Sequence, residues 1–103
     1  MTQIERITQM EQRLDASTEA LKKLSDALDA YEENRDALKK LMDYYGSSRW
    51  RKDFEADEQG KLPQDLKRGV LCEDTIYDLI LDHHDLIARM SQYVTEAINW
   101  QML

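Results

Sequence analysis

The chain has few of the residues that interrupt helices. It contains three glycines and one proline in 103 residues, and all four lie between Gly46 and Gly69. Average usage would give about 12% of the two types together. The long stretches on either side therefore hold no residue that would end a helix. This distribution predicts two long helices joined by a shorter, interrupted segment.

Familiar motifs of catalysis and cofactor binding are also missing. A single cysteine, Cys72, excludes an internal disulfide and favours a reducing compartment. The sequence has no glycine-rich phosphate loop, no His-Glu-x-x-His zinc motif, no Cys-x-x-Cys pair and no Gly-x-Ser-x-Gly elbow. We therefore expect no cofactor, no small-molecule substrate and no enzymatic activity.

Charge and hydropathy limit the class of partner. Fourteen Lys and Arg residues stand against 21 Asp and Glu residues, for a formal net charge of −7. This balance disfavours binding to nucleic acid or to an anionic membrane through bulk charge. The amino end shows no signal-peptide pattern, and no run approaches the ~18 consecutive apolar residues of a membrane span. We expect a cytoplasmic protein whose partners are proteins.

The pattern predicts one all-α domain: a long antiparallel helical hairpin with a short helical insertion between the two long helices. Thr2 and Glu5 have capping-box spacing, and Gly46 and Gly60 stand where a glycine would end a helix. The stretch 63–68 suits one helical turn closed by Gly69. The expected elements are a helix over about 2–45, a short helix over about 48–59, a turn over 60–71 with one helical turn, and a helix over about 73–101.

Apolar residues recur every seven positions along the first helix. The two rows are Ile7, Leu14, Leu21, Leu28, Arg35, Met42 and Met10, Ser17, Leu24, Tyr31, Leu38, Tyr45. Such a seam must pack against another helix. If Met42 is set opposite Ile76 in an antiparallel pair, Arg35 faces His83 across the seam. We interpret these two residues as a polar core layer that fixes the register, with a ligand or proton-switch site as the alternative.

The same register leaves the start of the first helix without a partner. Ile4, Ile7, Met10 and Leu14 would lie opposite residue numbers beyond 103. We expect a second copy of the protein to cover them, which makes the chain a homodimer. A frayed or bent amino end is the alternative.

The last helix carries an acidic stripe formed by Asp74, Asp78, Asp82 and Asp85. At 100° per residue these side chains lie within about 80° of one another, opposite the apolar face. One interpretation is that the stripe docks on the connecting segment, residues 46–71 between the two long helices, which holds six basic residues. A basic external partner and a metal are the other interpretations. A metal is disfavoured because adjacent helical residues such as His83 and His84 point about 100° apart.

One basic cluster contains an aromatic side chain. Trp50 lies between Arg49 and Arg51, and Phe54 follows it at i+4. This composition can contact nucleic acid, which the net charge disfavours. The pair Trp50 and Phe54 is either a hydrophobic face that packs onto the hairpin or a patch that contacts a partner.

The central segment carries a resemblance to a known family. The residues concerned are Tyr44-Tyr45-Gly46-Ser47 with Trp50, Asp57-Glu58-Gln59-Gly60-Lys61-Leu62-Pro63, Asp65-Leu66-Lys67-Arg68-Gly69-Val70-Leu71 and Glu73-Asp74-Thr75-Ile76-Tyr77-Asp78-Leu79. They resemble the bacterial domain of unknown function 4298 family over essentially the whole chain. Cys72 stands where that family's pattern has Ser, an ordinary helix cap. The resemblance implies a small helical protein and no particular activity.

These observations favour a protein-interaction or adaptor module that self-associates through helix seams. An acidic regulator is the alternative: its aspartate stripe would mimic the spacing of phosphates and bind a basic, nucleic-acid-binding protein. A metal-dependent enzyme comes third.

Overall fold

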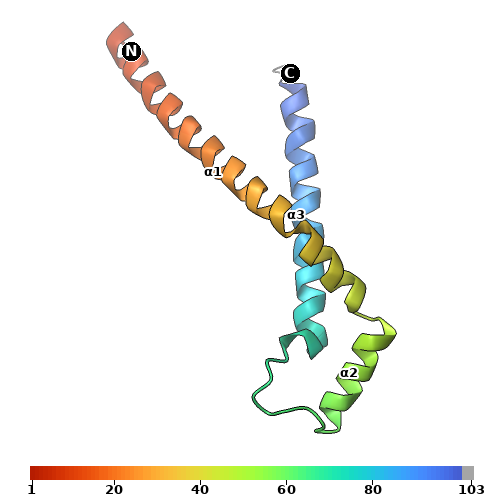
Figure 1. Cartoon of the computed structure of the whole chain (residues 1–103). Helices are drawn as coiled ribbons and strands as arrows, with labels where there is room; N and C mark the ends of the chain where they lie inside the picture. The colour runs from red at the N-terminus through yellow and green to blue at the C-terminus, as the bar shows by residue number, and fades with distance from the viewer. Residues whose placement is uncertain (101–103) are drawn as a thin grey trace. The chain divides into compact units, whose positions relative to one another are not determined.

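The computed structural model describes residues 1–100 and is all-α (Figure 1). Its elements are α1 (Gln3–Tyr44), α2 (Ser48–Glu58), the short 3-10 helix η1 (Gly69–Leu71) and α3 (Glu73–Asn99). No strand occurs between residues 1 and 100. The all-α class and the order of a long, a short and a long helix are confirmed. Gln101, the last residue predicted for the final helix, lies outside the described residues.

The chain divides into two compact units, one from Met1 to Lys39 and one from Lys40 onward. The amino-terminal unit is almost entirely the first part of α1, and α1 has no buried residue. The buried apolar side chains, Trp50, Leu71 and Ile76, all belong to the carboxy-terminal unit. The antiparallel register of the first and last helices joins residues of different units, and it stays a prediction.

Local signals place the helix ends. The Thr2 hydroxyl oxygen accepts a hydrogen bond from the Glu5 backbone N–H at 3.1 Å, as an N-cap does. Ser47 caps α2 in the same way, because its Oγ accepts from the Trp50 N–H at 3.2 Å. Gly46 and Gly60 follow α1 and α2 with φ of 80° and 69°, a region that glycine enters without a steric penalty. The two glycines predicted to end helices therefore do so, Gly46 after α1 and Gly60 after α2.

The predicted helical turn over 63–68 is wrong in position. Only one turn bond forms there, from the Leu66 N–H to the Pro63 carbonyl at 3.2 Å. The helical turn is η1, which Leu71 closes by donating to the Arg68 carbonyl at 3.0 Å. Gly69 therefore begins the turn and does not end it. The chain before η1 is held instead by a side chain, since Arg68 Nη2 donates to the Pro63 carbonyl at 2.5 Å.

Trp50 organises the core of the carboxy-terminal unit. Its indole Nε1 donates to the Val70 carbonyl at 2.8 Å, which ties α2 to η1 across 20 residues of sequence. The Trp50 ring meets the Tyr45 ring edge-on at 5.3 Å between centroids, and it stacks on Phe54 at 5.2 Å. Only 6% of Trp50 is exposed. A buried indole with a satisfied N–H thus fixes η1 against α2.

The start of α3 offers a stability test. Cys72 occupies the N-cap position with an extended backbone, but its side chain makes no capping hydrogen bond. A serine there can accept from the backbone N–H of Thr75, the third residue of the helix. We expect Cys72→Ser to raise the free energy of unfolding by about 0.5–1 kcal/mol. Thermal and urea denaturation followed by circular dichroism measure this change, and a Cys72→Ala variant that gained as much would contradict the capping explanation.

Candidate functional site

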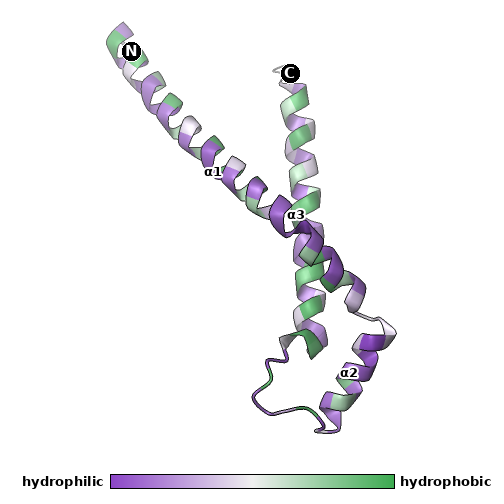
Figure 2. Cartoon of the chain, viewed as in Figure 1, coloured by the Kyte–Doolittle hydropathy of each residue, from purple (hydrophilic) through white to green (hydrophobic). Residues whose placement is uncertain are grey.

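The first candidate site is the apolar row at the start of α1, which we call the α1 seam: Ile4, Ile7, Met10 and Leu14. These side chains are 77%, 53%, 51% and 58% exposed. Figure 2 shows apolar residues recurring along α1 between hydrophilic ones. The row continues through Leu21, Leu24 and Leu28, which are also exposed. The structure therefore leaves the predicted interaction residues of the amino-terminal unit open to a partner.

Helix lengths show that α3 is too short to cover the whole of α1. α1 has 42 residues and α3 has 27. A full-length antiparallel pairing of the two helices would leave 15 residues of α1 beyond the end of α3. At 1.5 Å per residue that excess is about 22 Å. Its length matches the segment 3–17, which contains the whole α1 seam.

A second candidate site is an open hollow of about 730 Å³ in the carboxy-terminal unit. Apolar side chains make much of its lining, and three charged residues join them. The lining residues are Leu41, Lys67, Gly69, Val70, Thr75, Ile76, Asp78, Leu79 and Asp82. Lys67 of the connecting segment and Asp78 and Asp82 of the acidic stripe all line this hollow. Docking of the stripe on the connecting segment stays a prediction.

The acidic stripe is open to solvent along its length. All four aspartates are exposed, and none of them forms an ion pair with another residue between 1 and 100. Arg89, which belongs to α3 itself, lines a smaller hollow together with Asp82 and Asp85. The stripe therefore remains a solvated acidic surface with Lys67 and Arg89 as the basic residues beside it.

Arg68 pairs with α2 instead of the acidic stripe. Its Nη1 forms an ion pair with Asp57, and both side chains are partly buried. Together with the Pro63 contact, this pair folds the chain between α2 and η1 back onto α2. The charge count of the connecting segment did not reveal this arrangement, because it gives the number of basic residues and not the acid that each one reaches.

The sequence leaves two roles open for Trp50 and Phe54, packing inside the protein or contact with a partner. In the structure they have the packing role. Trp50 is buried with its N–H engaged, and Phe54 is half-buried against it. The alternative role, a patch that contacts a partner, is not open to Trp50, because its ring and its N–H are already used inside the unit. The neighbouring Arg49, Arg51 and Lys52 are exposed.

The predicted polar layer joins residues of two units. Arg35 is an exposed residue of α1, and His83 is a half-buried residue of α3. Their pairing stays a prediction. No three His, Cys, Asp or Glu residues between 1 and 100 gather in a group that could hold a metal ion. Nor does any helix in this range combine the length and the apolar character needed to cross a membrane.

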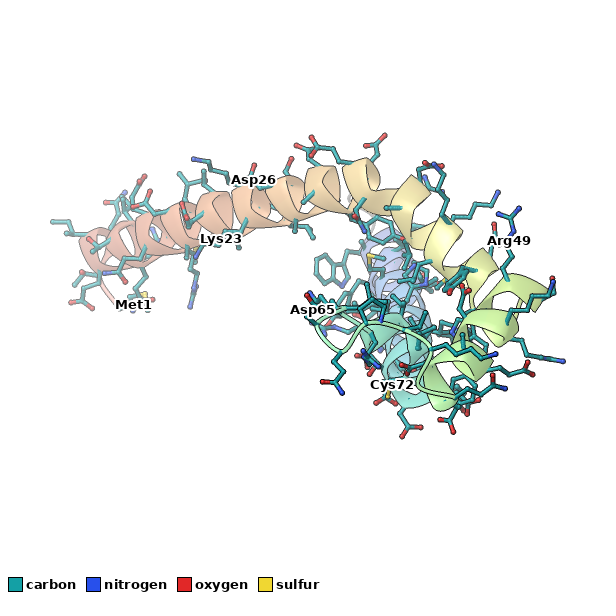
Figure 3. All side chains as sticks on the ribbon, turned by 60° about the horizontal axis from the view of Figure 1, so that its bottom comes forward. Met1, Lys23, Asp26, Arg49, Asp65 and Cys72 are labelled. Carbon is teal, nitrogen blue, oxygen red and sulfur yellow. The ribbon has the colours of Figure 1, made fainter. Side chains whose placement is uncertain are left out.

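Cys72 is exposed at the start of α3. The thiol makes no capping hydrogen bond, but the nearby hydroxyl and backbone N–H of Thr75 favour the charged thiolate and lower the pKa of Cys72 below its ordinary value. Figure 3 shows Cys72 at the compact end of the carboxy-terminal unit, whereas the side chains of Lys23 and Asp26 stand out from α1.

A tyrosine links the end of α1 to α2. The Tyr44 hydroxyl donates to Asp53 Oδ2 at 2.5 Å. Desolvation raises the pKa of Tyr44 to about 12, and the hydrogen bond to Asp53 and its negative charge add to the effect. The neutral phenol is thus the form that the folded unit favours.

This shift predicts a pH dependence. Because the folded pKa of Tyr44 lies above the ordinary 10.0, its contribution to stability is complete below pH 10 and is lost as the pH rises toward 12. We expect the free energy of unfolding of the wild-type protein to fall more steeply between pH 10 and 12 than that of Tyr44→Phe. Urea denaturation across this range measures the difference, and Tyr77→Phe, which removes an exposed hydroxyl, should follow the wild type. Parallel curves for wild type and Tyr44→Phe would contradict the assignment.

Comparison with known proteins identifies a family but no individual related protein. Comparison with curated proteins finds no match, and comparison with solved structures finds none either. The family described as Domain of unknown function (DUF4298) matches residues 7–93, which includes most of α1, the whole connecting segment and most of α3. This match confirms the resemblance seen in the central segment. The chain belongs to the DUF4298 family.

Proposed function

We propose that this protein is an interaction module that self-associates through the α1 seam. The observation that carries the proposal is the exposure of four consecutive seam residues, each more than half open to solvent. Contiguous apolar patches on protein surfaces mark interaction sites. A second copy supplies the same apolar row and therefore a surface of matching chemistry.

The lack of a core around α1 supports the same function. Helices in proteins are stabilised mainly by packing of an amphipathic face, because propensity alone contributes little. The amino-terminal unit has no buried residue to provide that packing. A helix partner would cover the seam and remove apolar surface from water, at about 25 cal/mol per Å².

Molar mass in solution tests this function directly. Light scattering over a concentration series should approach twice the chain mass of 12.2 kDa as the concentration rises. A mass of 12.2 kDa at every concentration would contradict self-association.

A further inference from the structure

Two oppositely charged residues flank the α1 seam at the positions that set orientation in a coiled coil. With Ile7 and Leu14 as a positions and Met10 as a d position, Arg6 is a g position and Glu11 is an e position. Residues at e and g lie beside the seam and contact the facing helix. The seam therefore has a charge pattern as well as an apolar surface.

Neither charge has a partner of opposite sign within reach on its own helix. The residues three and four positions from Arg6 are Thr2, Gln3, Gln9 and Met10, and those from Glu11 are Ile7, Thr8, Leu14 and Asp15. Neighbours on a helix surface are three or four residues apart, so no local ion pair forms. Asp15 at i+4 even repels Glu11. An ion pair for either residue would therefore need a partner on another helix.

The orientation of a second copy decides whether the charges attract. In a parallel, in-register pair, a g residue faces the e residue five positions later on the other helix. Arg6 then faces Glu11 of the second copy, and symmetry repeats this contact. In an antiparallel pair of the same seam, g faces g and e faces e. Two antiparallel registers keep the seam paired with itself. One places Arg6 against Arg13 of the second copy, and the other places Glu11 against Glu11.

From this charge pattern we propose that the second copy binds parallel and in register, α1 against α1, with Arg6 of each chain beside Glu11 of the other. This inference rests on the self-association proposed above and adds its geometry. Leu21, Leu24 and Leu28 are exposed and extend the same a and d rows. Arg35 is the next a position, where a parallel pair would bury two guanidinium groups in one layer. The pairing therefore ends before Arg35.

Cysteine cross-linking tests the orientation. Gln3 is a d position at the start of the seam, and Gln12 is an f position on the opposite face of the helix. Both are replaced by Cys, separately, in a Cys72→Ser background that removes the native thiol. In a glutathione redox buffer we expect Gln3→Cys to form a disulfide-linked dimer at least about tenfold faster than Gln12→Cys, because identical d positions are adjacent in a parallel pair and identical f positions face away from each other.

The outcomes separate this inference from the function on which it rests. A mass of twice 12.2 kDa without cross-linking at position 3 would overturn the parallel arrangement and leave self-association standing. In the antiparallel registers described above, Gln3 of one chain would face position 16 or 19 of the other, so the two Gln3 positions would be about 20–24 Å apart, too far for a disulfide. A mass of 12.2 kDa for the reduced protein would overturn self-association itself.

Charge exchange tests the register. Arg6→Glu places two glutamates together, and Glu11→Arg places two arginines together. We expect each single variant to raise the dimer dissociation constant about tenfold, and the double variant Arg6→Glu/Glu11→Arg to return near the wild-type value because it restores both pairs in reverse. A double variant as weak as the singles would overturn the assigned register.

Discussion

Trp50→Ala should unfold the carboxy-terminal unit or leave it barely stable. Removing a buried Trp side chain costs about 3–5 kcal/mol, because transfer free energy is lost and a cavity remains. Domains have only about 0.05–0.15 kcal/mol of stability per residue. For a unit that begins at Lys40 the loss is comparable with the total. The variant also removes the 2.8 Å hydrogen bond that Trp50 Nε1 donates to the Val70 carbonyl.

Trp100→Ala is the matched control, because Trp100 is 68% exposed. An exposed substitution usually changes stability by no more than about 0.5 kcal/mol. Urea denaturation of both variants, followed by circular dichroism, gives the two free energies of unfolding. A loss below about 1 kcal/mol for Trp50→Ala would show that the indole does not hold α2 and η1 together.

Local chemistry made much of the fold predictable. Glycines at Gly46 and Gly60 end helices because they enter the positive-φ region without a Cβ clash. Ser47 and Thr2 start helices because their hydroxyls accept from backbone N–H groups three residues ahead. Each of these helix ends depends on residues that are close together in the sequence, so the sequence pattern alone predicts it.

Long-range contacts were not predictable in the same way. The helical turn lies at Gly69–Leu71, where the Trp50 indole holds the Val70 carbonyl from 20 residues away. Arg68 pairs with Asp57 across 11 residues. Charge counting in the connecting segment favoured the acidic stripe of α3 as the counterpart, because composition gives the sum of charges and not their distances.

The candidate site is an intermediate case. Heptad spacing predicted that Ile7 and Leu14 share one face of a helix, and the structure leaves that face exposed. A seven-residue period shows that a helix should pack, but the same period suits α3 or a second copy. Helix lengths favour the second copy at the start of α1, since α3 is 15 residues shorter. The charges of Arg6 and Glu11, which flank the seam, then favour a parallel second copy.

Leu14→Asp should convert the proposed dimer to a monomer. Leu14 is an a position of the α1 seam and is 58% exposed within one chain, so a carboxylate there stays hydrated in the monomer. In a dimer, two Asp side chains would enter one apolar layer, and unpaired charges in such a layer are costly. We expect the dissociation constant to rise by at least about a hundredfold. Light scattering should then give 12.2 kDa at concentrations where the wild type has twice that mass.

Gln12→Asp separates the effect on association from the effect of Asp on the helix. Gln12 lies on the same helix, on the face opposite the seam, so both variants introduce an Asp in the helix interior and differ in the face that carries it. Gln12→Asp should keep the wild-type mass and the wild-type circular dichroism. Leu14→Asp should lose helical signal together with mass, because the amino-terminal unit has no buried residue of its own to hold it. If both variants remained dimeric, association would not use the α1 seam; if both dissociated, helix propensity and not burial of Leu14 would explain the result.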